Sequence, residues 1–68
     1  MEIIRQRLKE LREEKGLTVY ALSKQIGIAN QVIYQWERGE SLPTPESIVK
    51  ICKFFNCTAD FLLGLADE

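Results

Sequence analysis

The sequence predicts an all-α fold in which five short helices pack into a compact bundle. Apolar residues recur at intervals of three and four along most of the chain, which is the period of an amphipathic helix. Threonines stand where helices would begin, and glycine or asparagine stands where they would end. Apolar and polar residues nowhere alternate over a useful length beside turn residues, so no strand is expected. The 68 residues fit one small domain, residues 1–68.

The first helix is expected at residues 2–14. Its apolar residues share one face at helical spacing: Ile4, Leu8 and Leu11. The basic residues on its other faces are expected to form a solvated surface, balanced by neighbouring acids: Arg5, Arg7, Lys9, Arg12 and Lys15. Gly16 provides a natural C-terminal stop.

A second helix is expected at residues 19–25, with Thr18 as its N-cap and Leu22 buried. Gly27 makes the turn that follows, in a left-handed conformation that other residues resist. A third helix, expected at residues 29–38, would complete a helix-turn-helix. In that arrangement the second of the two helices is free to present one face to a groove.

The third helix separates two kinds of side chain when its residues are stepped 100° apart. The side expected to face the core is apolar: Ala29, Val32, Ile33 and Trp36. The outward side carries amides, a tyrosine and an arginine: Asn30, Gln31, Tyr34, Gln35 and Arg38. Asparagine and glutamine suit base reading, because either can make a bidentate hydrogen-bonded pair with adenine.

Two further helices follow. The fourth is expected at residues 45–55, with Thr44 as its N-cap and a proline at its first position. Its buried face is expected to hold four residues: Ile48, Ile51, Cys52 and Phe55. Asn56 can take the positive-φ position at its end. The last helix is expected at residues 59–63, with Thr58 as its cap.

The composition excludes several classes of function. A net charge of −1 argues against an indiscriminate nucleic-acid coat, which needs a strongly basic surface. No apolar run approaches the ~18 residues of a membrane helix, so no membrane partner is predicted and the protein is expected in the cytoplasm. Without histidine, Cys52 and Cys57 cannot complete a zinc site and are expected as small core residues. No nucleophile motif or phosphate loop is present, so we predict no enzyme, no catalytic residue, no cofactor and no small-molecule ligand.

Several segments follow one another in a fixed order along the chain: Leu8-(x)2-Leu11-Arg12-(x)3-Gly16-Leu17-Thr18, Leu22-Ser23-(x)3-Gly27-Ile28 and Ile33-(x)2-Trp36-Glu37-Arg38-Gly39, then Leu42-Pro43 and Leu62-Leu63-Gly64. Together they resemble the Cro/repressor-type (XRE-like) helix-turn-helix transcriptional regulators. The resemblance runs from about Ile4 to Gly64. It implies the fold of phage-repressor DNA-binding domains, with the helix-turn-helix in the second and third helices.

The resemblance also implies roles for individual residues. The base-reading residues would be Asn30, Gln31, Tyr34 and Gln35. The phosphate contacts would come from the start of the second helix and the end of the third: Thr18, Val19, Tyr20 and Arg38. Arg12 and Glu37 match a structural pair that ties the first helix to the end of the recognition helix.

Three residues depart from the family pattern, and all three lower the expected DNA affinity. Val19 stands where glutamine is common after the capping residue, and Ala29 stands where a serine or threonine cap is common. Glu40 stands where a basic residue would suit phosphate.

The sequence therefore predicts a sequence-specific regulator of transcription that binds double-stranded DNA. We expect a repressor, acting as a homodimer on a two-fold-related operator, with Phe61 and Leu65 of the C-terminal segment at the dimer contact. The alternative is a protein–protein interaction module, antirepressor or antitoxin-like, on a helix-turn-helix scaffold with weak DNA affinity. The acidic balance, Val19 and Glu40 favour that alternative, and the amide-rich outward helix favours DNA.

Overall fold

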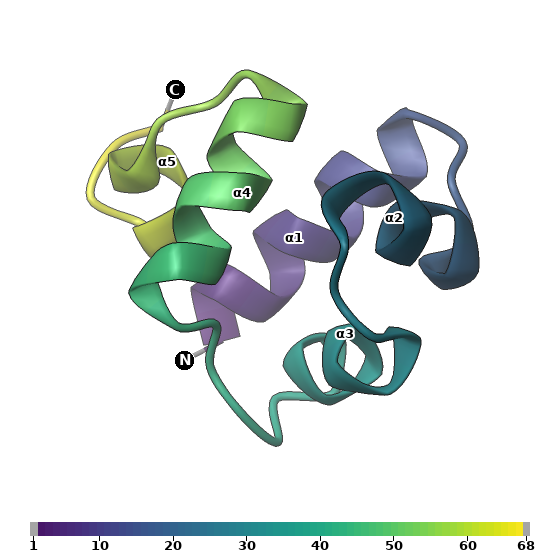
Figure 1. The fold of residues 1–68 in the computed structure, drawn as a ribbon. Helices are drawn as coiled ribbons and strands as arrows, with labels where there is room; N and C mark the ends of the chain where they lie inside the picture. The colour runs from purple at the N-terminus through teal and green to yellow at the C-terminus, as the bar shows by residue number, and fades with distance from the viewer. Residues whose placement is uncertain (1, 68) are drawn as a thin grey trace.

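The computed structural model describes residues 2–67 and contains, within that range, five α-helices and no strand. The helices are α1 (Glu2–Glu14), α2 (Val19–Ile26), α3 (Asn30–Glu37), α4 (Pro45–Phe55) and α5 (Ala59–Leu63) (Figure 1). The predicted all-α fold is confirmed. No helix in this range is long and apolar enough to cross a membrane.

The second and third helices end at slightly different residues from those predicted. α2 continues to Ile26, whose side chain is buried, so this helix is one residue longer. α3 is one residue shorter at each end, because Ala29 and Arg38 are its capping residues. The expected place of Ala29 on the apolar side of the helix is wrong. Its backbone is extended (φ −57°, ψ 137°), so the 100° step does not reach it and its side chain is exposed.

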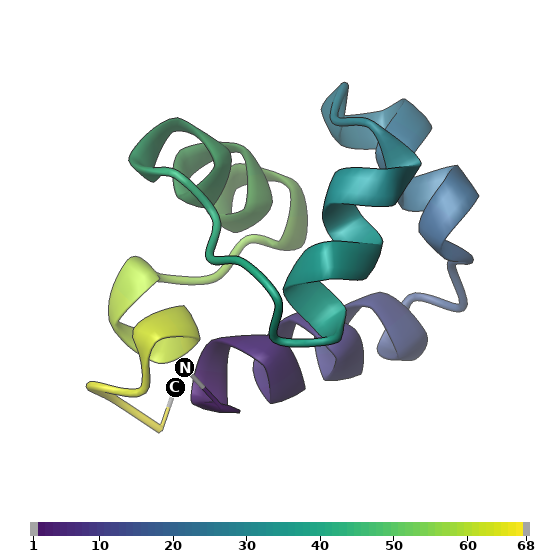
Figure 2. The same cartoon turned by 90° about the horizontal axis from the view of Figure 1, so that it is seen from below.

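The packing of the helices leaves one side of α3 open. α1 packs against α3 and α5, α2 packs against α3 and α4, and α4 packs against α5. α3 lies at the lower edge of the bundle in Figure 1 and is nearest the viewer in Figure 2, where the loop to α4 crosses beside it. Its neighbours cover only the inner side of α3, and its outer side remains available for contact with another molecule.

Each helix supplies one fully buried aliphatic side chain to a single core: Leu8, Leu22, Ile33, Ile51 and Leu62. Burying such a side chain stabilises the fold by about 1.5–3 kcal/mol. Trp36 is 3% exposed within the same cluster, which confirms that it packs in the core. The amphipathic pattern of the sequence therefore converges on one centre that all five helices share.

The helix ends carry the signals that the sequence predicts. The hydroxyl oxygens of Thr18, Thr44 and Thr58 each accept a hydrogen bond from the backbone N–H three residues later, at 3.0, 3.2 and 3.0 Å. Gly27 ends α2 with a φ of 68°, and Asn56 ends α4 with a φ of 54°, both in the left-handed region. These local bonds satisfy backbone groups that a helix end would otherwise leave unpaired.

The basic side of α1 is only partly the solvated surface that we expected. The Arg7 guanidinium donates to the backbone carbonyls of Phe61 and, at 2.6 Å, of Ala66. It also lies 4.3 Å from the centre of the Phe61 ring. Arg7 therefore holds α5 and the residues after it against α1, because its guanidinium hydrogen-bonds to backbone carbonyls in and just after α5 and lies over an aromatic ring.

The two cysteines pack against the core as half-buried side chains and are free thiols. The backbone N–H of Cys57 donates to the carbonyl of Cys52 at 3.0 Å, across the end of α4. Burial raises the pKa of the Cys57 thiol to about 11, and the neighbouring Cys52 adds to this. The Cys57 thiol is therefore protonated at neutral pH, and the role expected for these residues is confirmed.

Two glycines with positive φ should differ in their tolerance of alanine. At both, alanine adds a backbone strain of about 1–2 kcal/mol. At Gly64 (φ +83°) the added Cβ would also lie 2.9 Å from Cγ2 of Ile3, whereas at Gly27 (φ +68°) it would meet no atom within 4 Å. Urea unfolding should therefore show a larger loss of free energy for Gly64→Ala than for Gly27→Ala. Equal losses would contradict the close approach of α1 and Gly64.

Candidate nucleic-acid interface

α2 and α3 meet through a turn of only three residues, 27–29. The backbone N–H groups of Gly27 and Ile28 both donate to the carbonyl of Ser23, at 2.9 and 3.3 Å, and so close the end of α2. On one side of the turn, Ile26 packs in the core, and on the other side Ile33 does so. The pair of helices is therefore held as one unit by its turn and by its shared apolar contacts.

The outer side of α3 gathers the predicted base-reading residues. Gln31 and Tyr34 are exposed, and Gln35 is half-buried. Asn30 is also half-buried, and its Oδ1 is covered and has no hydrogen-bond partner among the described residues. Ala29 provides no side-chain cap for α3, and Asn30 does not replace it, because its Oδ1 accepts no hydrogen bond there. The outer face of α3 therefore presents side-chain amides and the phenol of Tyr34.

The start of α2 places a second set of predicted residues beside this face. Thr18 is engaged as the N-cap, and the side chain of Val19 is buried, 4% exposed. The backbone N–H groups of the first turn lack intrahelical acceptors, as at the start of any helix. Tyr20 is 61% exposed, and the Lys24 ammonium lies 5.2 Å from the centre of its ring. An open hollow lies between Tyr20, Ser23 and Lys24 of α2 and residues 27–30, which lead into α3.

The burial of Val19 was not predicted. We expected phosphate contact at Val19, without the side-chain amide that is common there, but its side chain belongs to the core. Its apolar character at the first position of the helix was the available signal.

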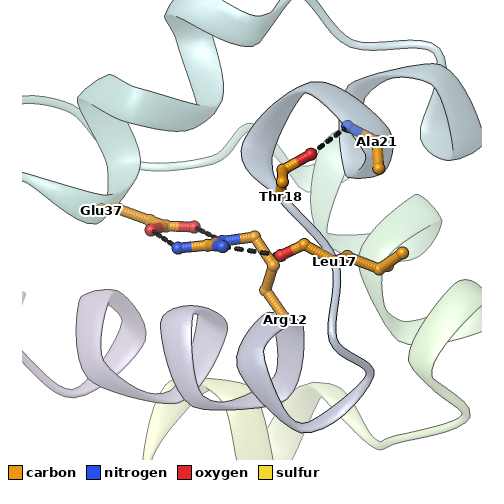
Figure 3. A network of polar contacts seen from close by, with 5 residues as sticks. All are labelled: Arg12, Leu17, Thr18, Ala21 and Glu37. Carbon is orange, nitrogen blue, oxygen red and sulfur yellow. Dashed lines mark hydrogen bonds and ion pairs between the residues drawn. The ribbon is translucent and has the colours of Figure 1, made fainter.

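Arg12 joins three parts of the structure. Its Nε and Nη2 donate to the two carboxylate oxygens of Glu37 at 2.7 and 2.8 Å, and its Nη1 donates to the carbonyl of Leu17 at 2.7 Å (Figure 3). The two side chains are only 13% and 8% exposed. The hydrogen bond to Glu37 raises the pKa of Arg12, because the carboxylate favours the charged guanidinium. The structure thus brings together the two residues that the sequence paired.

Arg38 ends α3 and lies on the surface in an ion pair with Glu40. Its Nε and Nη2 donate to the two carboxylate oxygens at 2.7 and 3.2 Å, and both side chains are about half exposed. The hydrogen bond from Arg38 lowers the pKa of Glu40, so the carboxylate is ionised at neutral pH. The sequence indicated Glu40 as an unfavourable charge but not this pairing, which depends on the path of the backbone through Gly39.

Among the side chains of residues 3–67, no three of histidine, cysteine, aspartate or glutamate lie close enough together to hold a metal ion.

A family model described as helix-turn-helix matches residues 8–62. The chain is 32% identical over 62 residues to the repressor protein C2 of Salmonella phage P22, and the match covers 91% of this chain and 29% of that protein. It is 40% identical over 59 residues to the HTH-type transcriptional activator BcrR of Enterococcus faecalis, and this match covers 87% of this chain and 29% of that protein. The chain thus spans less than a third of the length of these two relatives.

The fold also matches a solved member of the family. A crystal structure of the P22 c2 repressor in complex with a synthetic operator superposes with a TM-score of 0.83 at 31% sequence identity, covering 91% of this chain and 94% of that one. The chain therefore belongs to the helix-turn-helix family of transcriptional regulators, of the Cro/repressor type. The resemblance stated from the sequence is confirmed.

The Arg12–Glu37 pair should show strong coupling in a double-mutant cycle. Arg12→Ala and Glu37→Ala each leave a mostly buried charge without its partner, which should cost up to about 3 kcal/mol. The double variant should lose less than the sum of the two, as measured by urea unfolding. Arg38→Ala and Glu40→Ala provide the control, because deleting an exposed pair should leave stability almost unchanged. Additive losses at positions 12 and 37 would show that their contact contributes no stability.

Proposed function

We propose that the chain is a cytoplasmic, sequence-specific DNA-binding regulator of transcription that inserts the outer face of α3 into the major groove. The observation that carries this proposal is the chemistry of that face, which offers amides and a phenol and no acidic group before Glu37. Solvated helix surfaces more often use lysine and glutamate, which favour the helix more than asparagine does. A relative with the same fold has been crystallised with a synthetic operator, which supports DNA as the partner of this fold.

In this proposal, base reading belongs to Gln31 first, with Asn30, Tyr34 and Gln35 beside it. Gln31 is exposed in the first turn of α3, and the N-terminal residues of a recognition helix approach the bases most closely. Its side-chain amide can pair with N6 and N7 of adenine. Asn30 contributes less freely, since its Oδ1 is already covered.

Phosphate contacts would come from two ends of helices. The backbone N–H groups at residues 18–20 lie at the start of α2, where the helix dipole favours an anion. Arg38 stands at the end of α3 and is exposed. These contacts position the protein and carry no sequence information.

We further propose that the regulator represses and acts as a homodimer. A protein bound at an operator excludes others from that DNA without any additional surface, whereas activation needs one. A single short helix reads few base pairs, and two copies one helical turn apart would double the contacts. The C-terminal segment is the proposed contact, with Leu65 76% exposed. Phe61 contributes less, since Arg7 covers its ring.

The near-neutral charge of the helix-turn-helix segment favours a different function, a protein-interaction module with weak DNA affinity. Selection from a pool of random duplexes, followed by sequencing, separates the two. We expect enrichment of one sequence, which fluorescence anisotropy should show to bind more tightly than the starting pool. A pool that stays unenriched at low salt would favour the interaction module.

Gln31→Ala should weaken binding to the selected operator by about 1–3 kcal/mol and relax the preference at one base pair per half-site. The slope of log K against log salt should not change, since no phosphate contact is lost. Anisotropy titrations at several salt concentrations measure both quantities. Gln25→Ala, at an exposed position near the end of α2, is the matched control and should bind like the parent. If Gln31→Ala and Asn30→Ala also bind like the parent, α3 does not read bases.

Binding to the selected operator should fit two protomers per site. The selected sequences should show two-fold symmetry, with half-sites about 10 base pairs apart. Leu65→Glu should weaken operator binding without lowering the melting temperature, because the side chain is exposed. Val49→Glu, 53% exposed on α4, is the control for adding a charge to an exposed apolar position. One protomer per site and asymmetric sequences would exclude the dimer.

A further inference from the structure

The charges of the helix-turn-helix segment are all accounted for by contacts within the protein. Between Leu17 and Pro43 the chain has two basic residues, Lys24 and Arg38, and two acidic ones, Glu37 and Glu40. Glu37 is bound by Arg12 from outside the segment, and Lys24 lies over the Tyr20 ring. Arg38 is the basic residue of this segment at the end of α3, and its guanidinium is bound by the Glu40 carboxylate.

The position of Glu40 is fixed by the way α3 ends. The backbone N–H of Glu40 donates to the carbonyl of Gln35 at 2.9 Å, and that of Gly39 donates to the carbonyl of Trp36 at 3.1 Å. These bonds turn the chain back over the last turn of α3, so that the carboxylate comes alongside the guanidinium two residues earlier. The pair is thus a consequence of the backbone path.

The Arg38–Glu40 pair contributes little to folding but uses the groups that would bind phosphate. Both side chains are more than half exposed, and exposed ion pairs have small effects on stability because water and salt screen them. The carboxylate occupies Nε and Nη2, which form a bidentate edge of the guanidinium. A phosphate that uses this edge must displace Glu40.

We propose that Glu40 competes with DNA phosphate for the Arg38 guanidinium, and thereby lowers the affinity of the protein for every duplex sequence. The inference rests on the proposed function. Each contact at Arg38 exchanges one anion for another, so its net contribution is small. Weak sequence-independent binding leaves the protein free of bulk DNA, so that occupancy of DNA depends on base contacts and on the second protomer.

The test is a binding cycle of four proteins: the parent, Glu40→Gln, Arg38→Ala and the double variant. Each is titrated against the selected operator and against a random duplex at two salt concentrations. Glu46→Gln is the matched control, since it removes the same charge from an exposed position at the start of α4. Thermal melts establish that all five proteins fold.

Glu40→Gln should bind both duplexes about two- to fivefold more tightly than the parent, which is the range that exposed ion pairs support. The ratio of operator to random affinity should not change, and the gain should shrink at high salt. In the Arg38→Ala background, the effect of Glu40→Gln should fall to that of Glu46→Gln.

Three results would overturn the inference. An unchanged affinity of Glu40→Gln would show that Glu40 does not compete, while operator binding by the parent would leave the proposed function standing. An equal gain with and without Arg38 would show that Glu40 acts by its own repulsion of phosphate. A failure of the parent and Glu40→Gln alike to bind any duplex at low salt would overturn the proposed function together with the inference.

Discussion

The fold depends on the guanidinium of Arg12, which fixes the end of α1, the loop before α2 and the end of α3 with respect to one another. Burying a charge is costly, and here the cost is offset because three N–H groups of one planar cation meet two carboxylate oxygens and a carbonyl. Lysine could not span these acceptors, since its ammonium is a single point. The Leu17 carbonyl immediately precedes the cap of α2, so the same side chain sets both helices of the helix-turn-helix. The candidate interface combines the start of α2 with the length of α3. It keeps its shape only if these two helices are held rigidly with respect to each other.

Most of the fold could be predicted from the sequence, because helix ends are specified locally. Thr18 or Asn56 needs only neighbours within a few residues to act as a cap, and the apolar period identifies the buried face. The departures arise where distant segments meet. Arg7 bonds to Phe61, 54 residues away, and nothing near Arg7 in the sequence distinguishes it from a solvated cation. Val19 likewise enters the core only because α2 lies against its neighbours.

The candidate nucleic-acid interface, too, could be predicted from the sequence only in part. The outward face of α3 follows from 100° steps along a rigid helix, so the side chains of Gln31 and Tyr34 could be placed without a structure. The Arg38–Glu40 pair could not, since residues two apart do not face each other on a helix and meet here only through the turn at Gly39. Nor could the sequence show that the Oδ1 of Asn30 is covered and accepts no hydrogen bond from the described residues.

The Arg12–Glu37 and Arg38–Glu40 ion pairs affect how the outer face of α3 would discriminate between DNA sequences. Coulombic attraction to phosphate acts over about 10 Å at ordinary salt and is the same for every sequence, whereas amide–base hydrogen bonds act only at contact. In this segment both acids are bound to arginines, and one of those arginines would otherwise attract DNA. Uncharged groups then carry a larger share of the binding energy than they do on a basic surface. Because those groups are few on one short helix, the proposed DNA binding would gain most of its affinity from a second copy. The neutral surface and the proposed two-fold assembly are therefore consequences of the same arrangement of charges.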